Sequence, residues 1–199
     1  MISCLLFDIG NVLVTFDFSR AMARFAEQSP LPSATIRERL MPLVEQMECG
    51  LISSSEFITR GMAATEFGGP EEAFVTAYCD IFTENAPMVA RIPRLAGKVP
   101  LYLLSNTGGL HLDYLQTTFP VFAHFRGGVF SHLAGAAKPG PEIYRRAIAD
   151  CGLDPATTLY LDDAVANTAA GAALGLRVFT YDFKDDAAFE TCLDSWGLL

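Results

Sequence analysis

Residues 2–14 read ISCLLFDIGNVLV, an apolar run of strand length that ends at one carboxylate, Asp8. Gly10 and Asn11 follow directly, and both residue types tolerate unusual backbone angles. Because ligands of open α/β sheets bind beyond the carboxyl ends of the strands, Asp8 is a candidate nucleophile or metal ligand. Taken alone, the same stretch also fits a strand that simply ends in a turn.

The composition bounds the class of protein. The chain has 199 residues, of which 51% are hydrophobic, enough for one domain or a domain with a sizeable insertion. Its apolar runs fall short of the roughly 18 to 20 residues of a membrane helix, and its start lacks a basic, cleavable leader, so we expect a cytoplasmic protein with no membrane partner. A net charge of −9 disfavours a nucleic-acid partner. Five cysteines without CxxC spacing are interpreted as buried thiols in a reducing compartment.

Two hydrophobic rhythms divide the chain. Over residues 15–85 the apolar positions follow a helical period, and possible caps at Ser19, Ser33 and Ser53 predict four amphipathic helices, the second kinked or split by Pro42. Afterwards helices alternate with strands, which we expect at residues 99–104, 128–130, 158–161 and 177–181. This alternation predicts an α/β fold with a doubly wound parallel sheet. We therefore assign residues 1–14 and 86–199 to an α/β core and residues 15–85 to an inserted helical bundle.

Polar residues stand just after three of the expected strands. They are Asp8, Ser105 with Asn106, and Asp162 with Asp163. Because the carboxyl ends of parallel strands face one crevice, we expect these residues to converge there. Lys138, in a loop of Gly, Ala and Pro, would bring a cation to the same place. Each feature alone also fits a purely structural role: the polar pairs could cap helices, and the lysine could be a solvent-exposed loop residue.

Taken together, these segments resemble the haloacid dehalogenase-like hydrolase superfamily. The matching stretches, in the order of its motifs, are Phe7-Asp8-Ile9-Gly10-Asn11-Val12-Leu13, Leu104-Ser105-Asn106, Lys138-Pro139 with Glu142-Ile143-Tyr144, and Leu161-Asp162-Asp163 with Asn167. A helical insert after the first motif is where this superfamily places its C1-type cap. The DxGNV and LSNT sequences look most like those of bacterial phosphatases that act on glucose 1-phosphate and similar sugar phosphates.

The resemblance implies a Mg²⁺-dependent phosphohydrolase of small phosphate esters, in which Asp8 attacks phosphorus and forms an aspartyl-phosphate. Mg²⁺, which prefers oxygen ligands, would be held by the Asp8 carboxylate, the backbone carbonyl of Gly10, and Asp163. The remaining roles implied are those of Ser105 and the Asn106 backbone as phosphoryl ligands, Lys138 as the neutralising cation, and Asp162 as the support of Lys138 or of a metal-bound water.

One departure from the family pattern concerns proton transfer. In the usual phosphatases of this family, the residue two positions after the nucleophile is a second Asp, which protonates the leaving oxygen and later activates water; here it is Gly10. General acid–base catalysis is worth roughly 10² to 10⁴-fold, so we expect slower turnover or a bias toward anomeric sugar phosphates and aryl phosphates, whose leaving groups need little protonation. Asp17 is a candidate stand-in, although it also fits a helix N-terminus.

Two other functions stay open on the sequence. The first is metal-free dehalogenation of a 2-haloacid, in which Asp8 attacks carbon; the adjacent Asp162 and Asp163 argue against it, because a metal-free site for an anion gains nothing from two acids. The second is a low-activity module that binds a phosphorylated ligand or regulates a partner protein. Within the insert, Phe16, Phe18, Met47 and the turn at residues 49–51 are candidates for facing the site, and core packing explains most of them equally well.

Overall fold

The computed structural model describes residues 1–198 and contains the predicted parallel sheet, which confirms the α/β fold class. Its five strands are β1 (Cys4–Phe7), β4 (Leu101–Ser105), β5 (Gly128–Phe130), β6 (Thr158–Asp162) and β7 (Arg177–Thr180). They lie in the order β5-β4-β1-β6-β7, and every pairing is parallel. In chain order, β4 and β5 are added to the sheet on one side of β1, and β6 and β7 are then added on the other side. The carboxyl end of β1 is therefore the switch point of the sheet, where ligands of such folds bind.

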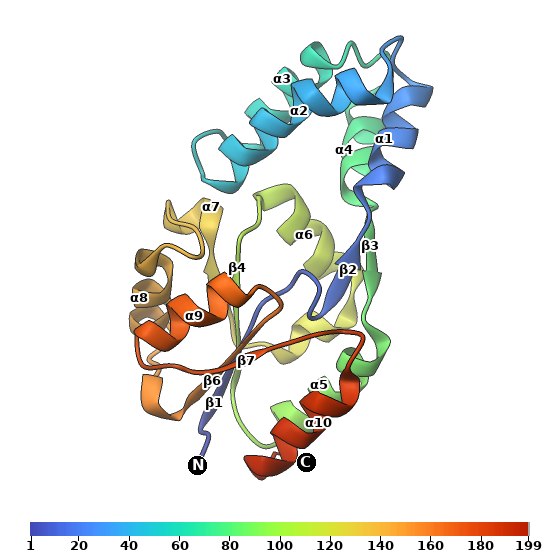
Figure 1. Cartoon of the computed structure of the whole chain (residues 1–199). Coiled ribbons are helices and arrows are strands. Elements are labelled where there is room, and N and C mark those ends of the chain that lie inside the picture. The colour runs from blue at the N-terminus through green and yellow to red at the C-terminus, as the bar shows by residue number, and fades with distance from the viewer. Residues whose placement is uncertain (199) are drawn as a thin grey trace.

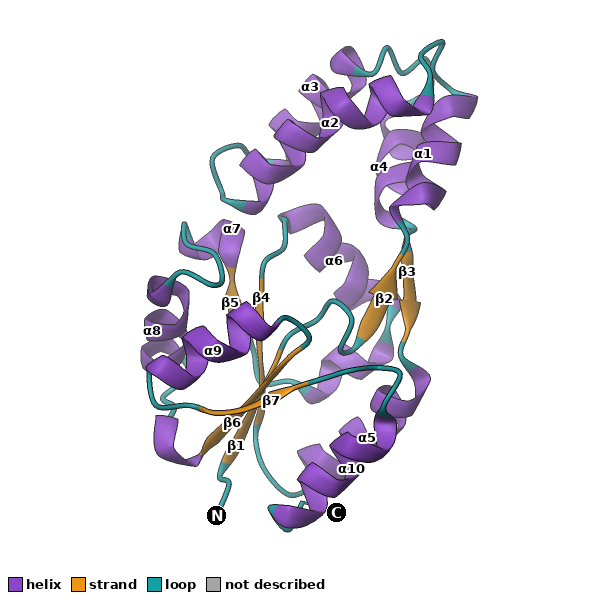
Figure 2. Ribbon diagram, viewed as in Figure 1, coloured by secondary structure: helices purple, strands orange, loops and turns teal. Residues whose placement is uncertain are grey.

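Helices cover both faces of the sheet, as Figures 1 and 2 show. One face packs against α5 (Ala86–Ala96), α6 (Gly109–Thr118) and α10 (Asp186–Ser195), and the other against α8 (Pro141–Asp150) and α9 (Val165–Ala173). Side chains of β1 alternate between the two: Leu5 and Phe7 belong to the first core cluster and Leu6 to the second. In a strand buried on both faces every side chain packs against apolar neighbours, which is why the sequence of β1 is a continuous apolar run.

Four helices fill the insert after β1. They are α1 (Phe18–Glu27), α2 (Ser33–Glu48), α3 (Ser54–Ala64) and α4 (Glu71–Cys79), and Figure 1 places them beyond the carboxyl ends of the sheet strands. They enclose a hydrophobic core of their own, in which Phe25, Phe57 and Phe74 are fully buried. The insert therefore has its own packing and stands over the edge of the sheet where Asp8 lies.

A two-stranded ribbon joins the insert to the sheet, and the helical rhythm read from the sequence did not predict it. β2 (Val14–Phe16) pairs antiparallel with β3 (Phe82–Glu84), so that Phe16 lies opposite Phe82. Helix α4 ends at Cys79, and Phe82 belongs to the ribbon rather than to the helix. Segments of three residues are too short to display a period of two, so the sequence pattern gave no signal for them.

Local corrections concern the helix ends. Asp17 rather than Ser19 caps α1, because its side chain accepts a hydrogen bond from the backbone N–H of Ser19. Helix α2 runs unbroken through Pro42, whereas Ser53 caps α3 as expected. Short elements that the sequence analysis did not anticipate are α7 (Ser131–Ala134) and the 3₁₀ turns Pro120–His124 and Pro155–Thr157. Across residues 1–198, every helix lacks the length or the apolar character needed to cross a bilayer.

The cysteines are less uniformly buried than expected. Cys4 and Cys79 are buried, Cys151 and Cys192 are partly exposed, and Cys49 is exposed at the end of α2. The interpretation of all five as buried thiols is therefore wrong for Cys49, whose apolar sequence neighbours do not shield a residue at the end of a helix.

Candidate active site

Asp8 lies at the carboxyl end of β1, directly after its last residue. Its backbone N–H donates to the carbonyl of Leu161 at 2.9 Å, and its Oδ1 accepts a hydrogen bond from the N–H of Ile9 at 2.7 Å. The residue is only 8% exposed. Burial first, and then the charge of Asp162, raises the pKa of Asp8 to about 6, although Lys138 acts in the opposite direction. The carboxylate is thus fixed in place and shielded from water on most sides.

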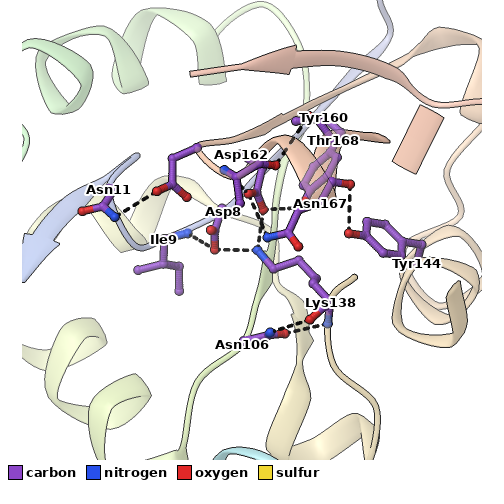
Figure 3. Close-up of polar contacts among 12 residues, drawn as sticks. Asp8, Ile9, Asn11, Asn106, Lys138, Tyr144, Tyr160, Asp162, Asn167 and Thr168 are labelled. Atoms are coloured by element: carbon purple, nitrogen blue, oxygen red, sulfur yellow. Dashed lines mark hydrogen bonds and ion pairs between the residues drawn. The ribbon is translucent and has the colours of Figure 1, made fainter. Parts of the chain in front are cut away.

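Lys138 joins two acids from different strands, as Figure 3 shows. Its Nζ lies 2.9 Å from Asp8 Oδ1 and 2.6 Å from Asp162 Oδ2, and its side chain is 1% exposed. Asn106 holds the lysine backbone at both ends: its Nδ2 donates to the Lys138 carbonyl at 2.9 Å, and its Oδ1 accepts from the Lys138 N–H at 2.8 Å. Lys138 is therefore no solvated loop residue, and its buried ammonium is shared between the two carboxylates.

Asp162 is fully buried, and both of its oxygens are engaged. Oδ2 accepts hydrogen bonds from Lys138 and from the hydroxyl of Tyr160, while Oδ1 accepts from the N–H of Ala164 and from Asn167 Nδ2, each at 2.9 Å. Burial alone would raise the pKa of Asp162, but these donors, Lys138 above all, hold the pKa below its usual range. Asp162 thus positions the lysine and has no oxygen left without a donor.

Tyr160 was missed from the sequence, although a signal for it exists. Residues two apart on a strand point to the same face, and Tyr160 stands two positions before Asp162 on β6. Its hydroxyl can therefore reach the carboxylate, and its ring is in edge-to-face contact with that of Tyr144. The signal that could have found Tyr160 is this spacing of two from Asp162 on a buried strand.

The arrangement of acids is compatible with a bound cation. Asp8, Asp162 and Asp163 each offer an oxygen within 4.8 Å of the others. Asp163 is half-buried, and its Oδ2 accepts a hydrogen bond from Asn11 Nδ2 at 2.9 Å. Because the oxygens of Asp162 are committed to protein donors, Asp8 and Asp163 are the carboxylates available to a metal, with Gly10 beside them on the cavity wall. An all-oxygen set with so few carboxylates fits Mg²⁺, which keeps several of its waters.

The predicted residues line one cavity of about 250 Å³. Those on its wall are Asp8, Gly10, Ser105, Asn106, Lys138 and Asp163; the fully buried Asp162 contacts it through Lys138. A second cavity, of about 270 Å³, lies under helix α2 and shares wall residues with the first. The shared residues are Gly10, Phe16, Ser105 and Asn106. A ligand that places one group among the carboxylates can therefore extend into the second cavity.

The insert rests directly on the loop that follows β4. Ser131 Oγ donates to the backbone carbonyl of Glu48 at 2.5 Å and accepts from the N–H of Thr107 at 3.0 Å, so one hydroxyl bridges the end of α2 and the core. Met47 is 1% exposed and lies so close to Gly108 that a Cβ there would stand 2.6 Å from its terminal methyl. Met47 therefore lines neither cavity, contrary to its candidate role. Phe16 and Phe18 do line the second cavity.

The candidate stand-in acid, Asp17, lies outside both cavities. Its Oδ1 accepts from the Ser19 N–H at 2.9 Å, which satisfies a helix N-terminus and lowers the pKa of the carboxyl. At position 10, an added Cβ would stand 3.1 Å from Phe16 Cε1, so the phenyl ring occupies space beside the missing side chain. Asp17 thus caps α1, and its carboxyl group does not replace the acid that is missing at position 10.

Removing the shared cation is expected to destabilise the fold. In Lys138→Ala, Asp8 and Asp162 would face each other in a buried site without their counter-ion, which costs about 3–5 kcal/mol when one partner of a buried ion pair is lost. Urea unfolding without Mg²⁺ measures the free energy of unfolding. The exposed Lys184, replaced by Ala, is the matched control and should change it by less than about 0.5 kcal/mol. A loss below about 1 kcal/mol in Lys138→Ala would contradict the buried pairing.

Comparison with known protein sequences finds similar proteins. The family model described as haloacid dehalogenase-like hydrolase matches residues 2–175. A D-ribitol-5-phosphate phosphatase from Bacteroides thetaiotaomicron is 26% identical in an alignment 191 residues long, and the match covers 90% of this chain and 91% of the relative.

Solved structures share the fold of this chain. A HAD family enzyme from Bacteroides thetaiotaomicron, in complex with magnesium and inorganic phosphate, has a TM-score of 0.79 and 26% identity, with 90% of this chain and 94% of that chain covered. A HAD-like family hydrolase from Porphyromonas gingivalis has a TM-score of 0.81 and 28% identity over 97% of this chain and 98% of that one. L-2-haloacid dehalogenase from Xanthobacter autotrophicus, at 17% identity and a TM-score of 0.62 over 89% of this chain and 76% of that chain, shares the fold alone.

Proposed function

The chain belongs to the haloacid dehalogenase-like hydrolase family, and on that premise we propose that it is a Mg²⁺-dependent phosphohydrolase of small phosphate esters. The observation that carries the proposal is the buried ammonium of Lys138, held between Asp8 and Asp162 at the switch point of the sheet, with Asp163 within reach of the same centre. A carboxylate, a buried cation and free carboxylate oxygens for a metal are the components that phosphoryl transfer needs. The solved relative with bound magnesium and inorganic phosphate supports it.

Asp8 is the proposed nucleophile. Its Oδ1 is held by the Ile9 N–H and by Lys138, so the carboxylate is aimed before a substrate arrives. An oxygen of Asp8 forms the bond to phosphorus as the ester oxygen leaves with its electron pair and takes up a proton. Water then attacks the aspartyl-phosphate, which releases inorganic phosphate and restores the carboxylate.

The phosphoryl oxygens are the next requirement. Ser105 and Asn106 line the same cavity as the acids, so the Ser105 side chain and the Asn106 backbone would bind these oxygens, while Lys138 offsets their charge as it develops. Mg²⁺, held by the Asp8 and Asp163 carboxylates and the carbonyl of Gly10, would supply further positive charge for these oxygens. The four helices α1–α4, together with the ribbon, are proposed as a cap that excludes water and shapes the second cavity.

Sugar or sugar-alcohol phosphates are the proposed substrates. The relative named D-ribitol-5-phosphate phosphatase supports this class. The resemblance of the DxGNV and LSNT sequences to those of sugar-phosphate phosphatases is in line with it. The cavity under α2 offers a place for a leaving group of that size beside the phosphoryl site.

A phosphatase screen tests the function. Sugar, nucleotide and amino-acid phosphates would be incubated with the protein, with and without Mg²⁺, and released phosphate measured. We expect release that falls at least about tenfold when EDTA removes Mg²⁺, since a hard cation must offset charge on the oxygens. Chloride release from 2-chloropropionate without metal, and no phosphate release, would instead establish the dehalogenase. Ligand-induced thermal stabilisation without any turnover would favour a binding module.

A further inference from the structure

The wall of the cavity under α2 carries acidic residues and, among the described residues, neither Lys nor Arg. Its titratable residues are Glu45, Glu48 and His111. His111 adds no positive charge, because burial lowers its pKa to about 4 and its Nε2 faces the Tyr78 carbonyl at 3.2 Å. The part of a substrate that occupies this cavity therefore meets carboxyl groups and aromatic rings, with no cation to offset a second negative charge.

Glu48 is the acid best placed to contact a ligand. It belongs to the last turn of α2, and its backbone carbonyl is tied to the core through Ser131, whose hydroxyl also accepts from Thr107. Thr107 follows Ser105 and Asn106 on the loop that both cavities share. The position of Glu48 is therefore coupled to the proposed phosphoryl site. Glu48 is half-buried, and this burial, with Glu45 as a smaller cause, raises the pKa of Glu48 to about 7.

Aromatic rings form the wall around the acids. Phe16 packs edge-to-face against Phe18 at 5.7 Å and against Phe82 at 6.5 Å between ring centroids, and all three rings line the cavity. Such a wall suits the C–H faces of a carbon chain, and the half-buried carboxyl group of Glu48 beside it suits hydroxyls. A carboxylate or second phosphate at this place would be desolvated next to Glu48 without a partner.

We propose that Glu48 determines the charge of the leaving group that the enzyme accepts: it binds the hydroxyls of an uncharged polyol and rejects phosphate esters that carry a second anionic group. This inference rests on the proposed phosphatase function and goes beyond it, because it assigns the selection to one cap residue. Glu45, on the same helix but exposed, contributes less.

Two substrates of equal length test the inference. D-glucitol 6-phosphate and 6-phospho-D-gluconate differ only at carbon 1, which is a hydroxymethyl group in the first and a carboxylate in the second. The assay is run at about pH 8.5, above the pKa of about 7, so that Glu48 is ionised. We then expect the wild-type kcat/KM to favour the glucitol ester by about tenfold or more, because a like charge beside Glu48 is unfavourable. Glu48→Gln should bring this ratio close to one and lower kcat/KM for the polyol, by roughly 10- to 100-fold if the lost hydrogen bonds involve a charged carboxylate.

Controls separate this inference from the proposed function. Glu45→Gln, the matched variant on the same helix, should change the substrate ratio less than about threefold. Far-UV circular dichroism checks that each variant is folded, and p-nitrophenyl phosphate reports phosphatase activity independently of a polyol. Suppose that p-nitrophenyl phosphate is hydrolysed, but that wild type has equal kcat/KM for both sugar esters or that Glu48→Gln leaves the ratio of the two kcat/KM values unchanged. The proposed role of Glu48 is then wrong, and the proposed phosphatase function is unaffected. If wild type hydrolyses no ester at all, both are wrong.

Discussion

Asp8→Asn is expected to abolish hydrolysis of p-nitrophenyl phosphate, by about 10⁴-fold or more, and to leave the fold intact. The amide is a poor nucleophile, so no aspartyl-phosphate forms. It keeps the volume of the carboxylate and an oxygen that can accept from the Ile9 N–H, and Lys138 retains its contact with Asp162. Because burial already disfavours the charged form of Asp8, a neutral side chain at this position is well tolerated.

Asp17→Asn is the matched control for this experiment. Asp17 is an exposed acid outside both cavities, and Asn caps a helix about as well as Asp, so stability and activity should stay near wild type. Steady-state kinetics gives the activities, and thermal unfolding shows whether each variant is folded. A folded Asp8→Asn enzyme with wild-type activity would remove Asp8 from the chemistry. A large loss in Asp17→Asn would instead show that the acid moves into the site during turnover.

The sheet and the convergence of its polar residues were predictable because both follow from general rules. A strand buried on two faces must be apolar, as residues 4–7 are, and the strands of a parallel sheet end at one edge. Those two rules bring Asp8, Asp163 and the Ser105 loop to one cavity without knowledge of any contact. The lysine was predictable only through its position, in a loop that follows a strand of the same sheet.

Other features depend on tertiary contacts that leave no periodic signal. The ribbon of β2 and β3 consists of two three-residue strands held together across the whole insert. The bridge from Ser131 to Glu48 joins residues 83 positions apart through one hydroxyl, and either residue alone reads as an ordinary helix position. The position of Glu48 beside the second cavity could be found only once the end of α2 had been placed on the core.

Gly10→Asp is expected to speed hydrolysis of alkyl phosphates, whose leaving oxygen needs a proton, by up to about 10² to 10⁴-fold. The backbone accepts the change, because Gly10 is not among the residues with a positive φ. A new carboxyl group at this position would stand between the nucleophile and the second cavity, since Gly10 lines both. The gain should grow as the leaving group becomes more basic and be small for p-nitrophenyl phosphate, and steady-state kinetics over a leaving-group series measures this slope.

The rate increase expected for Gly10→Asp depends on the position of the Phe16 ring. Its ring stands 3.1 Å from the position of a new Cβ, closer than ordinary contact, but it is 42% exposed on the ribbon and has room to move outward. We therefore expect Gly10→Asp combined with Phe16→Leu to exceed Gly10→Asp alone on basic leaving groups, while Phe16→Leu by itself gives no such slope. If neither variant accelerates any substrate in the series, another acid already protonates the leaving oxygen. A second Asp at position 10 would then be unnecessary, because another acid of the chain donates the proton. Glu48 is the first residue to replace in the search for that acid, because it lines the second cavity and its backbone is hydrogen-bonded to the core.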